Sequence, residues 1–534
     1  MLFFQDDRIK NYGKYIVPIS IALIVFWFHY PWYSFDSCWY IGYIDFFTGE
    51  SSLASWNPVR GFSYPLILYI AHVIKPGYIG LQIVLSAIYG VYCFYVLRFY
   101  YLIKGTLLQR PKIIEVVFIN IVMFYSPMIW GYAHIALTEF VAATVFVIYL
   151  YVCYKFLLGC KDMNKTGEII FVVKSSIILI FLWFLKQNYA IFVLGMLAVT
   201  YLLVSLKNRN VKCLINKALA LILVTALWLS SIAMWNNLLS KSKIVETIVQ
   251  DNEQSAGDTQ SDESSLVAVQ GVSTSLCLRY FSKVVVDGKY YGIVSGDNDE
   301  TLEYFESSSD NSDIKWLLEC FRENPKRLIR GFMDSYGLIA AIYSAPIINE
   351  DGSPRFQLGM VDRESLKEIW QGTSGSGAEE HYGLVYYHLS EMRDYYYEID
   401  YRRELLQTID SSVEKLDNYG YIAKENIITN IMSNDYIWII NMAVFSMMIL
   451  SIPVLFIIGL VVSFRKKRFG NLITLLTVPS ILYLAAHIYI GANIDRYAIP
   501  IYVVVKYIVV ILTIYIINTI AKVKNEKTNN NTCI

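Results

Sequence analysis

Several ionisable side chains lie at one boundary of the apolar segments, and their types could carry out a group transfer. They are Asp36, His134, Glu139, Lys186, His487, Asp495 and Arg496. A phosphate anion needs cations such as Lys186 and Arg496, and a hydroxyl nucleophile needs a carboxylate base within hydrogen-bond reach. Ionisable groups near membrane depth are costly and usually face a cavity or a partner. The pattern therefore predicts one polar cavity at a membrane boundary.

Each of these residues also has a purely structural interpretation. Asp36 could cap an interfacial helix, and Glu139 could be a first-turn carboxylate that the helix dipole favours. Lys186 could extend its ammonium toward the headgroups, and Arg496 could pair with the aspartate before it. His134 could be a hydrogen-bonded residue at the interface. The sequence alone leaves both interpretations open for each of them.

The composition indicates a polytopic membrane protein. Of the 534 residues, 55% are apolar and 17% are charged, below the roughly 25% charged residues of soluble domains. Mean hydropathy is +0.42. The formal net charge is zero and the sequence has no obvious DNA- or RNA-binding motif, so nucleic acid is not an expected partner. The start, MLFFQDDRIKNYGK, is too polar and acidic for a cleaved signal peptide, so the first apolar run is expected to stay as a helix.

Apolar runs of membrane-crossing length predict about ten transmembrane helices, and therefore an all-α membrane bundle. The runs are 15–32, 79–103, 113–130, 138–158, 168–185, 189–206, 217–235, 436–463, 471–490 and 498–520. A shorter run, 61–74, would extend only about 21 Å as a helix, less than the roughly 30 Å hydrocarbon core. We expect it to lie along the membrane interface.

The distribution of Lys and Arg gives the expected orientation. With ten spans, the basic clusters all fall on one side, which the positive-inside rule makes cytoplasmic. The clusters are Arg8–Lys14, Lys104–Lys112, Lys155–Lys165, Lys207–Lys217, Arg465–Arg468 and Lys522–Lys527. Both termini are then cytoplasmic, and the predicted cavity is extracytoplasmic. Residue usage rich in Ile, Lys, Asn and Tyr suggests an AT-rich bacterial genome, so we expect a bacterial inner (plasma) membrane.

The predicted helices divide the chain into three parts. Residues 1–236 form an N-terminal membrane domain with an outer loop at 33–78, and residues 435–534 form a C-terminal membrane part with a cytoplasmic tail. Between them lies a polar insert, 237–434, which is long enough for an extracytoplasmic domain of mostly α or α+β structure.

The insert carries two features of its own. Its acidic segment, about 246–265, is rich in Ser, Gln, Asn and Gly and is expected to be a flexible linker. Cys277 and Cys320 also lie in the insert. They could form a disulfide if the segment is secreted, or they could both remain unpaired.

Three short motifs border the outer side of the predicted bundle. Asp36-Ser37-Cys38-Trp39-Tyr40 follows the first helix and is followed in turn by Asn57-Pro58-Val59-Arg60-Gly61; Leu137-Thr138-Glu139 opens the fourth span; Asp495-Arg496-Tyr497-Ala498-Ile499-Pro500 precedes the last. Lys186 follows the fifth span. In order, side and spacing, these residues resemble the GT-C class of polytopic membrane glycosyltransferases, which includes protein O-mannosyltransferases and lipid A aminoarabinose transferases. The resemblance covers about 1–236 and 436–520, and leaves the insert unmatched.

The resemblance implies an inverting transfer of a sugar from a polyprenyl-phosphate donor in the bilayer to a glycan, lipid or protein acceptor on the extracytoplasmic face. It implies that Asp36 is the catalytic base and that Lys186 and Arg496 hold the phosphate. The other implied substrate-binding residues are Tyr40, Arg60, His134, Glu139 and Tyr497.

The first motif departs from the class in one respect. Many members of the class carry two adjacent acidic residues in the first outer loop, whereas Ser37 follows Asp36 here. Asp45 or Glu50 could supply the second carboxylate. The departure weakens the inference of a bound metal, so no metal ligand is assigned and a divalent cation stays open as a cofactor.

Two other functions remain open from the sequence. A lipid-linked saccharide transporter or flippase would also need cations for a phosphate but no base, and such proteins often contain internal repeats, which we do not see here. An O-antigen-type polysaccharide polymerase would have many spans and a large outer loop, with a diphosphate-linked donor. The sequence does not identify the sugar or the acceptor.

Overall fold

The computed structural model describes most of the membrane part of the chain. It describes residues 7–240 apart from gaps at 29–30, 32–34, 52–55, 57–60, 108–112, 160–164 and 209–210; then residues 322, 347–348 and 354–355; then 444–513 apart from gaps at 445–446, 459, 462–466, 490–497, 508 and 511–512. Nearly all of the predicted insert, including the acidic segment and both of its cysteines, lies outside these residues.

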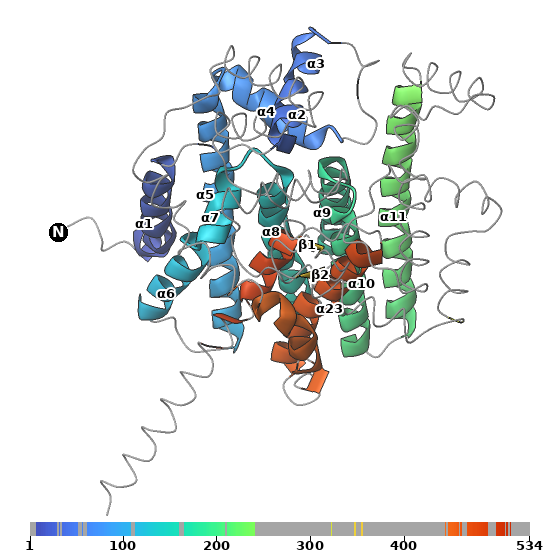
Figure 1. Cartoon of the computed structure of the whole chain (residues 1–534). Coiled ribbons are helices and arrows are strands. Elements are labelled where there is room, and N and C mark those ends of the chain that lie inside the picture. The colour runs from blue at the N-terminus through green and yellow to red at the C-terminus, as the bar shows by residue number, and fades with distance from the viewer. Residues whose placement is uncertain are drawn as a thin grey trace, which may run out of the picture.

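The described residues form a helical bundle (Figure 1). The N-terminal part contains α1 (Asp7–Trp27), α2 (Phe35–Gly42), α3 (Ile44–Thr48), α4 (Ser63–Ile74), α5 (Tyr78–Leu107), α6 (Ile113–Phe124), α7 (Pro127–His134), α8 (Thr138–Gly159), α9 (Lys165–Leu185), α10 (Tyr189–Asn208) and α11 (Val211–Ser240); the C-terminal part contains α23 (Lys467–Tyr489). Helices α5, α8, α9, α10 and α11 run side by side, and α2, α3 and α4 lie across one end of them.

Within the described residues, α5, α8, α9, α10 and α11 are long and apolar enough to cross a membrane. Shorter apolar helices cover Gly13–Trp27, Met447–Ile458 and Gly470–Ala485, in three further runs that the sequence predicts as spans. The prediction of a membrane bundle is therefore confirmed in outline, while the number of crossings stays a prediction.

The third predicted span is not a single helix. Ser126 adopts an extended backbone conformation, and Pro127 begins α7, which separates it from α6. Proline lacks the N–H that would continue the helix. The hydroxyls of Tyr89 and Tyr92 on α5 donate to the last carbonyls of α6, at 2.7 and 3.0 Å. Helix α6 is therefore only about 18 Å long, and the crossing predicted for the run 113–130 stays a prediction.

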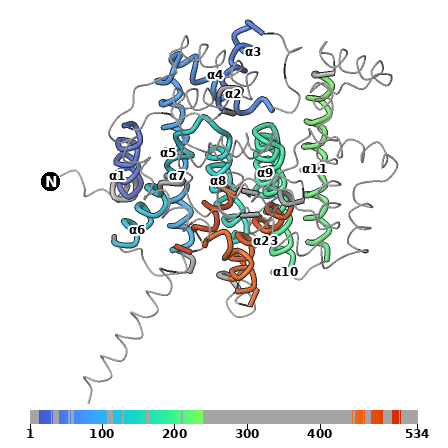
Figure 2. The backbone as a smooth tube through the Cα atoms, viewed as in Figure 1, coloured from blue at the N-terminus to red at the C-terminus, as the bar shows by residue number. Residues whose placement is uncertain are grey.

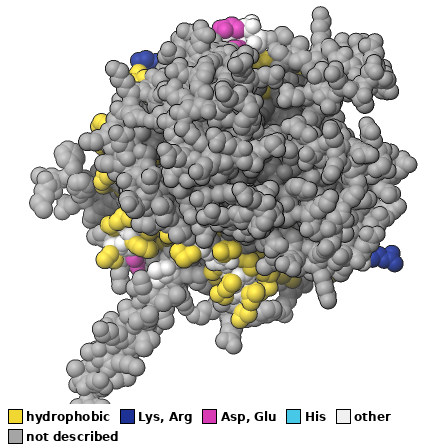
Figure 3. Space-filling model, in the orientation of Figure 1, with side chains coloured by type: hydrophobic (Ala, Val, Ile, Leu, Met, Phe, Trp, Pro, Cys, Tyr) yellow, Lys and Arg dark blue, Asp and Glu magenta, His cyan; other side chains and the backbone are white. Residues whose placement is uncertain are grey.

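Many exposed side chains of the described helices are large and apolar, as expected of helices that face lipid. Exposed large side chains follow one face of α1 and one face of α6: Ile16, Val17, Ile21 and Ile24, then Ile114, Val117, Phe118 and Ile121. Most described side chains visible in Figure 3 are likewise hydrophobic. Helix α11 stands at the edge of the described bundle (Figure 2), and only 6% of its most apolar stretch is buried.

The short run predicted to lie at the interface forms α4, a helix of 12 residues. It packs against α2, α3, α5 and α9. Its buried side chains include Tyr64, Leu68 and Ala71. The helix therefore belongs to a layer, α2–α4, that covers one end of the bundle, and its position in a membrane interface stays a prediction.

Basic side chains gather at the opposite end of the bundle. Lys104 near the end of α5 pairs with Glu115 at 2.6 Å, and Lys217 near the start of α11 pairs with Glu168 at 2.6 Å. The ammonium of Lys207, in the last turn of α10, donates to a main-chain carbonyl of α8 at 3.2 Å. The described members of the predicted cytoplasmic clusters thus share one end, away from α2–α4.

The C-terminal segments pack into the same core. Helix α23 lies against α10 and α8, and Gly195 of α10 faces Pro479 of α23. Residues 499–507 are also helical, and the Tyr507 hydroxyl donates to the Val96 carbonyl of α5. The C-terminal segments therefore pack into the same bundle as the N-terminal helices.

Two observations concern the predicted insert and its border. Helix α11 continues to Ser240, four residues past the expected boundary at 236. Two-residue strands β1 (Ile347–Ile348) and β2 (Pro354–Arg355) pair antiparallel. The fold of the insert otherwise stays a prediction.

Candidate functional site

An ion pair joins two of the predicted site residues. The ammonium of Lys186 lies 3.6 Å from a carboxylate oxygen of Glu139. Glu139 is in the first turn of α8, where the helix dipole favours an anion, and Lys186 directly follows the last turn of α9, where the dipole favours a cation. The Glu139 side chain is 1% exposed and that of Lys186 is 18% exposed. The Lys186 side chain is therefore the more accessible partner of the pair.

Short turns hold both partners in place. The Tyr189 amide donates to the Lys186 carbonyl at 3.0 Å, which closes the turn between α9 and α10. The Tyr189 hydroxyl lies 3.4 Å from the Thr138 hydroxyl at the start of α8. These contacts fix the start of α10 against the start of α8, so Glu139 and Lys186 are held by three helices.

Tyr40 extends this cluster to α2. Its ring is 3% exposed and packs edge-on against Tyr64 of α4, with centroids 5.1 Å apart. Tyr189 lies within electrostatic range of both Tyr40 and Glu139. The structure therefore brings three predicted site residues, Tyr40, Glu139 and Lys186, to the end of the bundle that α2–α4 cover.

Asp36 is placed through its backbone. It is in the first turn of α2, four residues before Tyr40, so positions 36 and 40 share one face of that helix. Three other predicted site residues, Arg60, Arg496 and Tyr497, lie outside the described residues. Their roles, and the catalytic role of Asp36, stay predictions.

Gly61, just before α4, packs closely against α9. A Cβ at position 61 would lie 2.1 Å from the Phe184 carbonyl oxygen, closer than any side chain can approach. Phe184 is two residues before Lys186. Gly61, the last residue of the predicted motif, therefore touches the helix end that carries Lys186.

Replacing this glycine should move the loop. We expect Gly61→Ala to lower stability by about 1–3 kcal/mol, since the added methyl meets backbone atoms that cannot rotate away. Thermal unfolding in detergent measures the effect. Gly42→Ala is the matched control, because a Cβ at position 42 has no atom within 4 Å. Equal melting temperatures for the two variants would contradict the close contact.

An aromatic cavity borders the same helix end. It has a volume of about 520 Å³ and is lined by Phe46, Phe47, Trp56, Phe62, Ile180, Phe184, Ser231, Met234, Trp235 and Leu238. Trp235 of α11 packs against Phe62 and Trp56, with centroids 5.2 and 5.8 Å apart. Apart from the Ser231 hydroxyl the lining side chains are apolar, so the cavity suits a hydrocarbon better than a sugar.

His134 has structural contacts on both ring nitrogens. Nδ1 lies 2.8 Å from the Trp130 carbonyl oxygen and Nε2 lies 3.0 Å from the Phe26 carbonyl oxygen. The ring stacks on Phe26 at 3.7 Å and is fully buried. Gln82 donates to the same Phe26 carbonyl at 3.2 Å. These side chains satisfy carbonyls at the C-terminal end of α1. In this structure the His134 ring joins α7 to α1, and its substrate-binding role stays a prediction.

Several residues of this region are not identified by the sequence reasoning. Thr138 and Tyr189 stand beside predicted residues, but nothing in their pattern marks them. The cavity has a weak signal, because Trp56 and Trp235 lie near the ends of apolar segments, where interfacial aromatics are common. Among the described residues, no group of three His, Cys, Asp or Glu side chains is arranged to hold a metal ion.

Comparisons with family models, with curated proteins and with solved structures give no match to this chain.

Proposed function

We propose that this chain is an inverting membrane glycosyltransferase that moves a sugar from a polyprenyl-phosphate donor to a glycan, lipid or protein acceptor on the extracytoplasmic face. The proposal keeps the resemblance to the GT-C class, with about ten spans. The proposal rests on one observation: a charged pair and an apolar aromatic cavity lie next to each other at one end of the bundle. The partly exposed Lys186 ammonium, paired with Glu139, stands two residues from Phe184, which lines the aromatic cavity.

This combination fits a lipid that carries a phosphate. The phosphate would contact the Lys186 ammonium as a charge-assisted partner, and Arg496 would supply a second cation. The first isoprene units would enter the cavity between α9 and α11. A water-soluble nucleotide sugar would gain nothing from such an apolar lining, which favours a lipid-linked donor.

The proposed reaction has one displacement step. The acceptor hydroxyl attacks the anomeric carbon and forms the new C–O bond, while its proton passes to the Asp36 carboxylate. The bond from the anomeric carbon to the phosphate oxygen breaks, and polyprenyl phosphate leaves with the electron pair. Lys186 and Arg496 would stabilise the charge that develops on the phosphate. Tyr40 and Glu139 would orient the sugar or the acceptor.

The direct test is reconstitution of the purified full chain in liposomes with a panel of polyprenyl-monophosphate sugars and candidate acceptors. Mass spectrometry should detect a glycosylated acceptor together with free polyprenyl monophosphate. Movement of an intact donor across the bilayer without bond cleavage would instead identify a transporter. Release of polyprenyl diphosphate from a diphosphate-linked glycan would identify a polymerase. Either result would reject the proposal.

A further inference from the structure

Two cations, Arg98 and Lys14, lie beside the contact between α1 and α5, away from the proposed site; we call this surface the α1–α5 groove. Arg98 of α5 is partly exposed, and its guanidinium carbon lies 4.7 Å from the centroid of Tyr151, 5.5 Å from that of Phe94 and 5.8 Å from that of Tyr95. Among the described residues, Arg98 forms no ion pair with a carboxylate. A guanidinium in a membrane-crossing helix usually has an anionic partner.

Lys14 of α1 lies in the same groove. Its ammonium is exposed and is 4.8 Å from the centroid of Tyr101 and 5.3 Å from that of Tyr15. The Tyr15 and Tyr101 rings meet edge to face, with centroids 5.3 Å apart, and the Tyr15 hydroxyl is within electrostatic range of Arg98. The groove therefore presents two cations and tyrosine hydroxyls together, all of which can donate hydrogen bonds to one anion.

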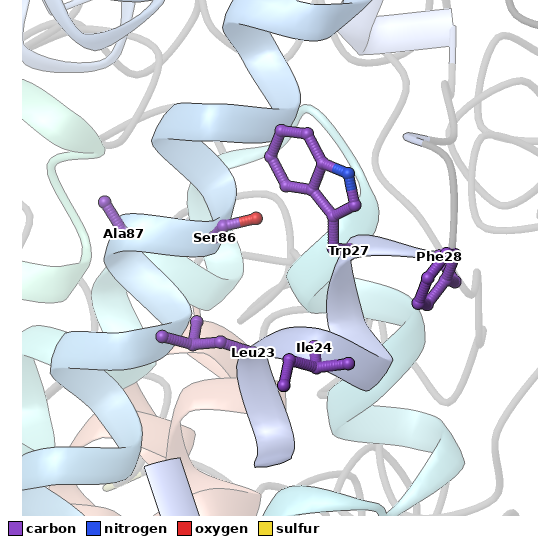
Figure 4. Close-up of a pocket in the computed structure, with 6 residues that line it drawn as sticks. All are labelled: Leu23, Ile24, Trp27, Phe28, Ser86 and Ala87. Carbon is purple, nitrogen blue, oxygen red and sulfur yellow. The ribbon is translucent and has the colours of Figure 1, made fainter. Parts of the chain in front are cut away.

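Farther along the same two helices, α1 and α5 together line an apolar hollow (Figure 4). This hollow has a volume of about 470 Å³ and is lined by Leu23, Ile24, Trp27, Phe28, Ser86 and Ala87. Residue 87 is about 16 Å from residue 98 along α5, which is close to half of the roughly 30 Å hydrocarbon core. An acyl chain whose headgroup sat at Arg98 could therefore end in the hollow near the bilayer midplane.

We propose that the α1–α5 groove binds one anionic phospholipid, with its phosphate against Arg98 and Lys14 and one acyl chain in the hollow. Both cations lie toward the end of the bundle that carries the Lys104–Glu115 and Lys217–Glu168 pairs, so the lipid belongs to the leaflet at that end. A zwitterionic lipid would bind less well, because its own cation competes for the phosphate. The site is separate from Glu139 and Lys186 and does not depend on the chemistry proposed for them.

Native mass spectrometry of the full chain in detergent tests this site, with dioleoyl phosphatidylglycerol and dioleoyl phosphatidylcholine as the two probes. The wild type should retain phosphatidylglycerol more strongly. Arg98→Gln should weaken phosphatidylglycerol binding about tenfold and leave phosphatidylcholine binding unchanged, while Arg98→Lys should keep most of the preference. Lys165→Gln, an exposed cation at the start of α9, is the matched control and should behave as the wild type.

A second variant and a competition experiment complete the test. If Arg98→Gln does not fold, Lys14→Gln removes the exposed cation and should weaken phosphatidylglycerol binding about fivefold. Inorganic phosphate should not displace the bound lipid; displacement would show that a soluble anion is the ligand. Equal retention of the two lipids by the wild type, or unchanged phosphatidylglycerol binding in the cation variants, would also overturn the proposal.

Discussion

Asp36→Asn should reduce glycosyl transfer by about 10²- to 10⁴-fold, the usual contribution of a general base. Position 36 shares a face of α2 with Tyr40, which lies in the cluster around Glu139. Asparagine has nearly the same size as aspartate but cannot accept the proton of the acceptor hydroxyl. The turnover number in reconstituted liposomes measures the loss, while the affinity for the lipid donor should change little.

Glu50→Gln tests the exposed one of the two other carboxylates, Asp45 and Glu50, in the loop that follows Asp36. Glu50 follows α3 and its side chain is exposed, so its replacement should leave the fold intact. We expect near-wild-type transfer from this variant. If Glu50→Gln lost activity while Asp36→Asn kept normal turnover, the general base would be Glu50, and Asp36 would have no role in the mechanism.

Lys186→Met should lower both activity and stability. The Glu139 carboxylate is 1% exposed, and losing its cationic partner leaves a buried charge less compensated. We expect a loss of about 2–3 kcal/mol, somewhat below the roughly 3–5 kcal/mol of a fully buried pair, because the ammonium is partly exposed. Transfer should fall by about 10²- to 10³-fold through lost stabilisation of the leaving phosphate.

The double variant Glu139→Gln/Lys186→Met separates these two effects. Without the buried carboxylate, the chain no longer carries an uncompensated charge, so the melting temperature should recover most of its wild-type value. Transfer should stay low, because the phosphate still lacks the cation. If activity recovered together with stability, the ion pair would be a structural element only, and Lys186 would have no place in phosphate binding.

Local rules explain which parts of this arrangement could be predicted from the sequence. Glu139 and Lys186 are far apart in the chain, yet both stand at a boundary between an apolar run and a short turn. Because successive membrane helices are antiparallel, helices of similar length bring alternate turns to the same end. The sequence therefore predicts a shared end for these residues, and the 3.6 Å ion pair is the observed consequence.

Other features depend on which helices pack against each other, and hydropathy gives no information about that. The run 113–130 is mostly apolar, and its break at Pro127 depends on Tyr89 and Tyr92 of another helix satisfying the carbonyls that the break exposes. The sequence suggests His134 as a substrate-binding residue, but only the position of α1 shows that its Nε2 contacts the Phe26 carbonyl. The groove cation Arg98 lies within an apolar run, so the sequence reasoning did not single it out.

The orientation of the bundle is the claim on which the proposed chemistry rests. Gln187→Cys places a thiol in the turn beside Lys186, and Lys165→Cys places one at the opposite end of α9. Labelling of intact cells with a membrane-impermeant maleimide, scored against the parent chain, should modify position 187 at once and position 165 only after permeabilisation. Labelling of position 165 in intact cells with position 187 protected would put Glu139 and Lys186 on the cytoplasmic face and contradict the account.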